Sequence, residues 1–161
     1  MTEQATSGQF QKEILEFLEE TFERVHGIYL DQGTSFFETL EHVTAEEASS
    51  RASDRRASVA AHVRHVAFYL RVLQASIRGE SVGKVNWLEI WESDRPVTPE
   101  AWRATIVELR EEYARVTRLM KDPATWEKED AVGGSMAMVT HTAYHLGAIR
   151  QALGVIRARP G

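Results

Sequence analysis

Hydrophobic residues recur every three to four positions in four long stretches of the chain, and this spacing predicts four amphipathic α-helices. The predicted helices cover residues 8–30, 58–78, 98–122 and 135–157. No stretch of comparable length alternates between apolar and polar residues, so the sequence predicts no β-sheet. We therefore expect an all-α fold in which four helices surround one apolar core.

Residues with strong positional preferences mark several helix ends. Thr98 is a favourable N-cap, and Pro99 after it suits the first helical position. Ser135, which follows two glycines, is the expected N-cap of the last helix. Thr44 and Glu47 have the spacing of a capping box, which predicts a short helical turn between the first two long helices.

The connection between the second and third predicted helices, residues 79–97, is long for a helical bundle. A segment of that length can run the full height of the helices, so the helices it joins need not be antiparallel neighbours. Periodicity alone does not distinguish a simple up-down order from an order with a crossover. Trp87 and Trp91 lie in this connection, and we expect them to anchor it to the helices, with the lining of a substrate mouth as the alternative.

Residues 49–57 are small, polar and charged, which predicts a surface loop before the second helix. The loop carries Arg51, Arg55 and Arg56. We expect these arginines to be solvated, and the alternative is that they attract an anionic substrate.

Composition and charge narrow the class of protein. With 161 residues, of which 43% are hydrophobic and 27% charged, the chain is expected to form a single globular domain over residues 1–161. The formal net charge of −5 argues against binding to a nucleic-acid backbone. No apolar run reaches the roughly 18–20 residues that cross a bilayer, so no membrane association is expected. Residues 1–8 lack the basic and apolar parts of a signal peptide, which predicts a cytoplasmic location.

The chain contains no cysteine. This excludes disulfides, cysteine-ligated zinc, iron–sulfur clusters and a catalytic thiol of the protein's own. Any nucleophile must therefore be an oxygen, a nitrogen, a metal-bound water or a thiol that arrives as a cosubstrate.

The last predicted helix carries a histidine pair, His141 and His145. Residues four apart lie one turn above each other on the same helix face, so both imidazoles can reach one point. The pair falls on the apolar stripe that includes Ile149, where an unpartnered polar ring is costly. A divalent metal would satisfy both rings, whereas the alternative is a pair of packing histidines. Thr142 stands where a zincin protease needs glutamate, which excludes that class.

The second predicted helix offers a third ligand, because His62 and His65 are three residues apart and share roughly one face. One of them would complete the three nitrogens of an open catalytic site, and the other would support a ligand. Nitrogen ligands favour nickel or zinc. Since the ligands must be deprotonated, metal affinity is expected to fall as the pH drops through about 6.5. His26 and His42 have no partner in sequence and are expected to be ordinary, partly exposed residues.

Two segments, SVAAHVRHVAFYL at residues 58–70 and HTAYHLGAIRQAL at residues 141–153, resemble the DinB/YfiT-like superfamily. The resemblance extends over essentially the whole chain. It implies a four-helix bundle of up-down-down-up topology with a long crossover between helices two and three. It also implies a metal site formed by His65, His141 and His145.

The same resemblance implies the range of activities. Members include transferases and isomerases that use a low-molecular-weight thiol, and proteins described as metal-dependent hydrolases. For this chain it implies a divalent metal, nickel or zinc, a small-molecule substrate, a thiol cosubstrate and a homodimer. No general base can be assigned from the sequence, so the catalytic residues stay unknown. The alternative function is a non-catalytic metal-binding or structural bundle.

Overall fold

The computed structural model describes residues 2–160, with side chains described for residues 8–160. The described chain is all-helical and contains no strand, as predicted. Over the same residues, no helix combines the length and the apolar character needed to cross a membrane. The elements are, in chain order, α1 (Thr2–Phe22), α2 (Phe36–Leu40), α3 (Ala45–Ser49), α4 (Val59–Ile77), α5 (Glu89–Glu92), α6 (Pro99–Lys121), the 3-10 helix η1 (Pro123–Glu127) and α7 (Ala131–Arg157).

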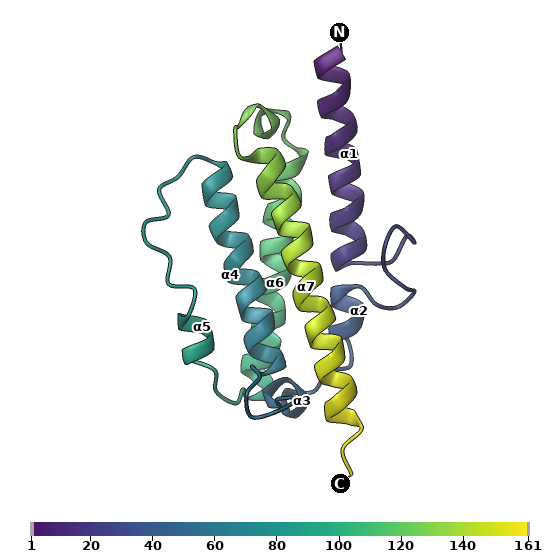
Figure 1. The fold of residues 1–161 in the computed structure, drawn as a ribbon, viewed down its shortest axis with the longest axis vertical. Helices are drawn as coiled ribbons and strands as arrows, with labels where there is room; N and C mark the ends of the chain where they lie inside the picture. Colours follow the sequence, from purple (N-terminus) through teal and green to yellow (C-terminus); the bar gives the residue numbers. More distant parts are fainter. Residues whose placement is uncertain (1, 161) are drawn as a thin grey trace.

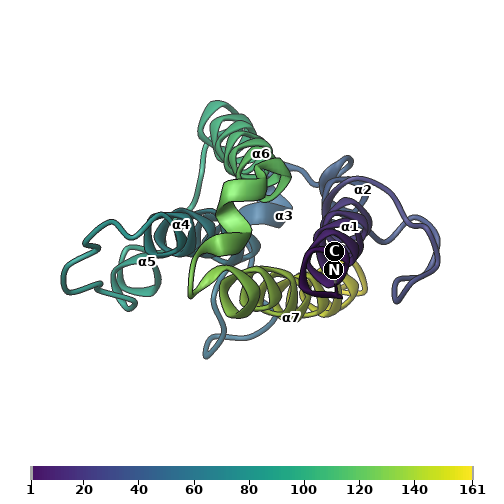
Figure 2. The same cartoon turned by 90° about the horizontal axis from the view of Figure 1, so that it is seen from above.

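The four long helices pack around a common interior. Helix α4 packs against both α6 and α7, and α1 packs against the same two helices. Seen from above, α1 and α4 therefore lie opposite each other, with α6 and α7 between them (Figure 2). The chain runs downward in α1 and α7 and upward in α4 and α6 (Figure 1).

The interior is filled by apolar side chains from all four long helices and from α2. Each fully buried large side chain contributes about 1.5–3 kcal/mol relative to an exposed one. The largest of these buried apolar side chains are Leu18, Phe22, Phe36, Leu40, Leu70, Ile77, Leu109, Met120, Met138, Leu146 and Ile149. Most of them lie on the stripes that the periodicity predicted.

Helix α1 ends at Phe22 and not near residue 30, so the predicted C-terminal end was wrong. The cause is Glu20, whose buried carboxylate collects the chain that follows the helix. Gly27, with φ of +86°, supplies the turn that brings this chain back. At distances of 2.6–2.9 Å, the carboxylate accepts hydrogen bonds from the backbone N–H groups of His26, Ile28, Tyr29 and Leu30. Burial raises the pKa of Glu20, but these four donors outweigh it and lower the pKa to about 2.

Helix α7 begins at Ala131, four residues before the predicted start at Ser135. Gly133 and Gly134 therefore lie inside the helix and do not end a loop. The reason is packing, because a Cβ atom at Gly134 would lie 2.8 Å from Cδ1 of Ile77 on α4. The absence of a side chain at this position lets α7 approach α4 closely.

Two of the predicted helix starts are confirmed. The Thr98 side chain accepts a hydrogen bond from the Ala101 backbone N–H, and Pro99 occupies the first position of α6. Thr44 and Glu47 form the predicted capping box, with side chain to backbone distances of 3.1 and 2.9 Å.

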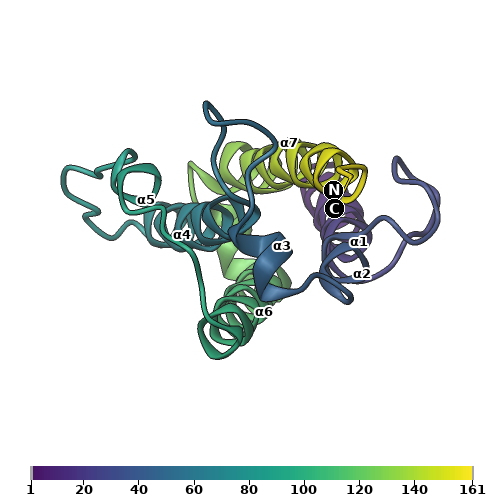
Figure 3. The same ribbon diagram turned by 90° about the horizontal axis from the view of Figure 1, so that it is seen from below.

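The connection that follows α4 returns along the outside of that helix (Figure 1). It carries α5 and reaches the start of α6 near α3, which is visible from below (Figure 3). Because the connection spans the height of α4, helices α4 and α6 are neighbours that run in the same direction. The length of residues 79–97 permits this path.

Candidate metal centre

Three histidines from two neighbouring helices meet where α4 packs against α7. His65 comes from α4, and His141 and His145 come from α7. Each offers one ring nitrogen, and these three atoms all lie within 4.8 Å of one another. The side chains of His65 and His145 are buried, at 6% and 4% exposed, and His141 is half-buried. The structure thus brings together the three residues that the sequence analysis selected.

In this histidine cluster, His145 lies edge to face with the other two rings, and the rings of His65 and His141 are tilted at 49° to each other. The ring centroids of His141 and His145 are 4.5 Å apart at an interplanar angle of 64°. His65 lies 4.8 Å from His145 and 5.1 Å from His141. The one-turn spacing on α7 produces the first contact, and the packing of α4 against α7 adds the other two.

Two nitrogens of the cluster have no partner. Nδ1 of His65 and Nε2 of His141 are buried and make no hydrogen bond with the described residues. Leaving a buried polar atom unsatisfied costs about 1–3 kcal/mol. A divalent ion bound between the rings would give the converging nitrogens a partner, and imidazole nitrogen suits zinc or nickel. The residues present therefore fit a metal of this class.

All three rings are held in the neutral form. Burial, together with the neighbouring histidines, lowers the pKa of His145 to about 3 and that of His141 to about 4. Burial also lowers the pKa of His65. Neutral imidazole is the form that binds a metal. The titration expected near 6.5 from the sequence is therefore moved to lower pH by burial.

His62 lies beside the cluster and contacts one of its members. The Nδ1 atoms of His62 and His145 are 2.9 Å apart, so one of them donates a hydrogen bond to the other. His62 is not among the three residues whose nitrogens converge. The geometry favours His65 over His62 as the third ligand, because a ring nitrogen of His65 converges with those of the α7 pair, whereas His62 contacts Nδ1 of His145.

Aromatic side chains surround the cluster. Tyr69 stacks on His141, with centroids 3.6 Å apart and an interplanar angle of 15°. Trp91 of α5 lies 4.6 Å from His65. The sequence analysis did not select Tyr69, although its position four residues after His65 places it on the same face of α4. Trp91 was expected to anchor the connection to the helices, but its contact with His65, 26 residues away in sequence, was not predicted.

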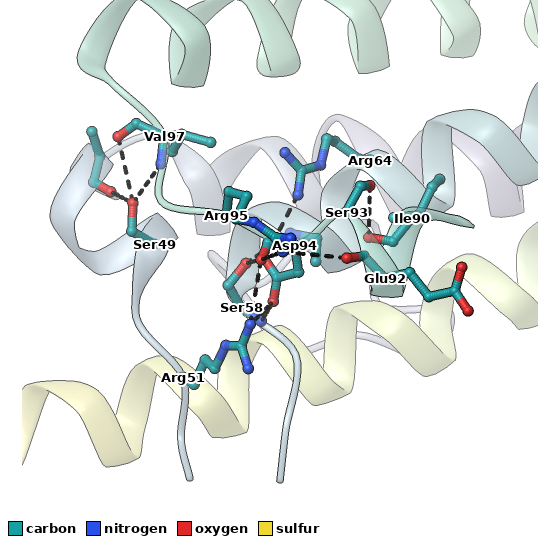
Figure 4. Close-up of polar contacts among 12 residues, drawn as sticks. Ser49, Arg51, Ser58, Arg64, Ile90, Glu92, Ser93, Asp94, Arg95 and Val97 are labelled. Atoms are coloured by element: carbon teal, nitrogen blue, oxygen red, sulfur yellow. Dashed lines mark hydrogen bonds and ion pairs between the residues drawn. The ribbon is translucent and has the colours of Figure 1, made fainter. Parts of the chain in front are cut away.

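A buried carboxylate, Asp94, fixes the end of the α4–α6 connection (Figure 4). It accepts hydrogen bonds from the backbone N–H of Ser58 at 3.0 Å and from its hydroxyl at 2.6 Å. It also pairs with Arg51 at 2.9 Å and with Arg64 at 3.6 Å. These contacts join the connection to the first residue before α4, and they hold α5 beside the histidines. Arg51 therefore forms an ion pair with Asp94, and the expectation that this arginine is only solvated was wrong.

No acidic side chain of the described residues joins the three converging histidines. His26 and His42 are also not part of the cluster. His26 lies 3.3 Å from the Glu19 carboxylate, and the side chain of His42 is 84% exposed. Both agree with the expectation of ordinary, partly exposed residues.

Comparisons of the chain with family models, with curated proteins and with solved structures give no match. The resemblance to the DinB/YfiT-like superfamily therefore stays a prediction. What supports a function for this chain is the geometry of its histidine cluster.

Proposed function

We propose that His65, His141 and His145 hold one divalent metal ion, zinc or nickel, and that the protein is a metalloenzyme acting on a small molecule. One observation carries this proposal. Three neutral imidazoles converge within 4.8 Å in a buried site, and two of their nitrogens have no other partner. A bound metal would give the converging nitrogens a partner in this buried site.

The proposed scaffold is a DinB-like four-helix bundle with up-down-down-up topology. Its support is the packing of α1 and α4 against both α6 and α7, together with the shared direction of α4 and α6 (Figure 1). Residues 1–161 would then form one domain, and a cytoplasmic location belongs to the same proposal.

The proposed reaction is thiol-dependent transfer or hydrolysis. When bound, a divalent ion held by three neutral histidines supplies Lewis-acid chemistry and lowers the pKa of a bound water or thiol. Because the chain has no cysteine, a thiol would have to be a low-molecular-weight cosubstrate. Tyr69 and Trp91 supply apolar surface beside the histidines, which would keep bulk water from the reacting groups.

His62 would orient His145. If Nδ1–H of His145 donates to Nδ1 of His62, Nε2 of His145 is left unprotonated for a ligand and the rotation of the ring is fixed. His62 is a positioning residue in this proposal and holds no metal itself.

The test is metal analysis of the purified protein and of two variants. Wild type is expected to carry close to one equivalent of zinc or nickel, and His145→Ala is expected to lose it. His42→Ala is the control, because His42 is exposed and lies outside the cluster. A full equivalent of metal in His145→Ala would show that the proposed site is wrong.

A non-catalytic metal-binding bundle is the second candidate. The observation that favours it is that no carboxylate of the described residues joins the cluster as a general base. The two candidates differ in one measurement, a screen of the metal-loaded protein with thiol cosubstrates. Turnover that is lost in His145→Ala supports the enzyme, whereas metal-dependent stability without any turnover supports the structural role.

We also propose a homodimer, formed through the outer face of α7. No residue from 131 to 149 carries a formal charge with histidine neutral, yet this face exposes Met136 and Tyr144, at 51% and 72%. The two charged residues of α7 contact their own chain, Arg157 at Glu47 and Arg150 at Thr39. In a chain with a net charge of −5, an uncharged face is where a second copy can dock without like-charge repulsion.

A further inference from the structure

A cavity of about 340 Å³ lies between the loop that precedes α4 and the end of α5. It is separate from the histidine cluster but adjacent to it. The side chains that matter for its chemistry are Arg51, Asp54, Arg55, Arg56, Trp91 and Asp94. Three arginines against two aspartates give this lining a net charge of +1.

The arginines of this cavity differ in what they already bind. Arg51 is paired with Asp94, whose carboxylate also accepts two hydrogen bonds from Ser58 (Figure 4). In the described part of the chain, the side chains of Arg55 and Arg56 form no ion pair and no hydrogen bond. Asp94 therefore neutralises Arg51 and leaves two guanidinium groups available to a ligand.

Trp91 is a wall shared by the cavity and the histidine cluster. It lines the cavity, and its ring lies 4.6 Å from that of His65 and 5.4 Å from that of His62. A group bound in the cavity would thus be separated from the proposed metal by one indole ring.

We propose that this cavity is an anion subsite, in which Arg55 and Arg56 bind an oxyanion, a carboxylate or a phosphate, of a small molecule whose reacting end extends past Trp91 to the histidines. Guanidinium groups are suited to this role, since their forked donors match the paired oxygens of both anions. The inference rests on the proposed function and deepens it by naming the substrate class.

The first test needs no metal. The indole N–H signal of Trp91, assigned with Trp91→Phe, is followed by NMR while phosphate or acetate is added at constant ionic strength. Wild type is expected to show a saturable shift, and Arg55→Gln/Arg56→Gln is expected to bind at least tenfold more weakly. Arg118→Gln/Lys121→Gln removes two charges at the far end of α6 and should behave like wild type.

Each outcome of the NMR titration either identifies the class of anion or overturns the proposal. A stronger response to phosphate than to acetate assigns a phosphate ligand, and the reverse assigns a carboxylate. An equal shift in wild type and in Arg55→Gln/Arg56→Gln, or no saturable shift with either anion, would overturn the anion subsite.

The second test measures whether the subsite and the cluster serve one ligand. Cobalt-loaded protein is titrated with mercaptocarboxylates of increasing length and with 2-mercaptoethanol, and the cobalt–thiolate absorption band is recorded. One chain length is expected to bind best, and its advantage over 2-mercaptoethanol should disappear in Arg55→Gln/Arg56→Gln. If all thiols bind equally in both proteins, the subsite is wrong and the metal site stands. If no thiol gives the band while the phosphate or acetate shift persists, the proposed metal function is the part that fails.

Discussion

The Nδ1 atoms of His62 and His145 lie 2.9 Å apart across the contact between α4 and α7. Only one of the two can donate, so the tautomers of the two rings are coupled. When Nδ1 of His145 donates to Nδ1 of His62, Nε2 of His145 carries no proton and is the nitrogen left for a ligand. This relationship makes the roles of His62 and His65 separable by mutation.

His62→Ala is expected to weaken metal binding by roughly 10–100-fold, the usual effect of losing a partner of a ligand. His62→Gln keeps a hydrogen-bonding group and should recover part of that loss. Competition with a metal chelator measures both affinities, and the cobalt spectrum reports any change in ligand geometry. Unchanged affinity in His62→Ala would contradict the positioning role. A loss as complete as in His65→Ala would make His62 a ligand.

The metal-free protein is expected to lose stability as the pH falls. Burial holds the pKa of His145 at about 3 and that of His141 at about 4, below the unfolded value of about 6.5. The unfolded chain therefore binds more protons below pH 6.5, and the free energy of unfolding declines from there until the pH reaches the folded pKa values. Between pH 7 and pH 5 each of the two histidines should contribute about 2 kcal/mol to the decline, measured by urea unfolding. His141→Ala/His145→Ala should flatten this pH dependence. An equal slope in wild type and in this variant would show that the two histidines do not cause it.

Gly134→Ala is expected to destabilise the protein by about 1–3 kcal/mol, the usual cost of overpacking a core. The new Cβ would lie 2.8 Å from Cδ1 of Ile77, whose side chain is buried and must move. Gly133→Ala is the matched control on the same helix, because nothing lies within 4 Å of a Cβ there. That change should stabilise α7 by about 0.5–1 kcal/mol. Thermal unfolding of both variants measures these two changes in stability. Ile77→Val, added to Gly134→Ala, should recover part of the lost stability because valine lacks the Cδ1 atom that the new Cβ would contact.

Tyr144→Glu is expected to convert the proposed homodimer into a monomer. It places a charge on each side of a two-fold contact, at a side chain that is 72% exposed within one chain and so is not needed for folding. Light scattering should give twice the 18.2 kDa chain mass for wild type and that mass for the variant. Glu111→Gln, on α6, is a control that should leave the dimer intact. A monomeric wild type at micromolar concentration would contradict the proposal.

The sequence predicted the long helices and the convergent histidines because both follow from spacing along one helix. It did not predict the end of α1, because Glu20 collects backbone N–H groups up to ten residues away, which periodicity does not record. The glycine pair at the start of α7 was mistaken for a helix boundary, since the contact of Gly134 with Ile77 joins residues far apart in the chain. Spacing along one helix does not distinguish His62 from His65 as the third ligand. The difference between them arises only when α4 packs against α7.

Asp94 has a mechanical consequence for access to the histidines. It anchors one end of the α4–α6 connection at Ser58, and Trp87 packs against Phe68 and Tyr69 of α4. Residues 81–85, near the other end, make no hydrogen bond with the described residues, and Gly79 and Gly83, both with positive φ, lie beside and within this stretch. An outward movement of residues 79–85 would therefore leave Trp87, Asp94 and the walls of the anion cavity in place beside the histidines.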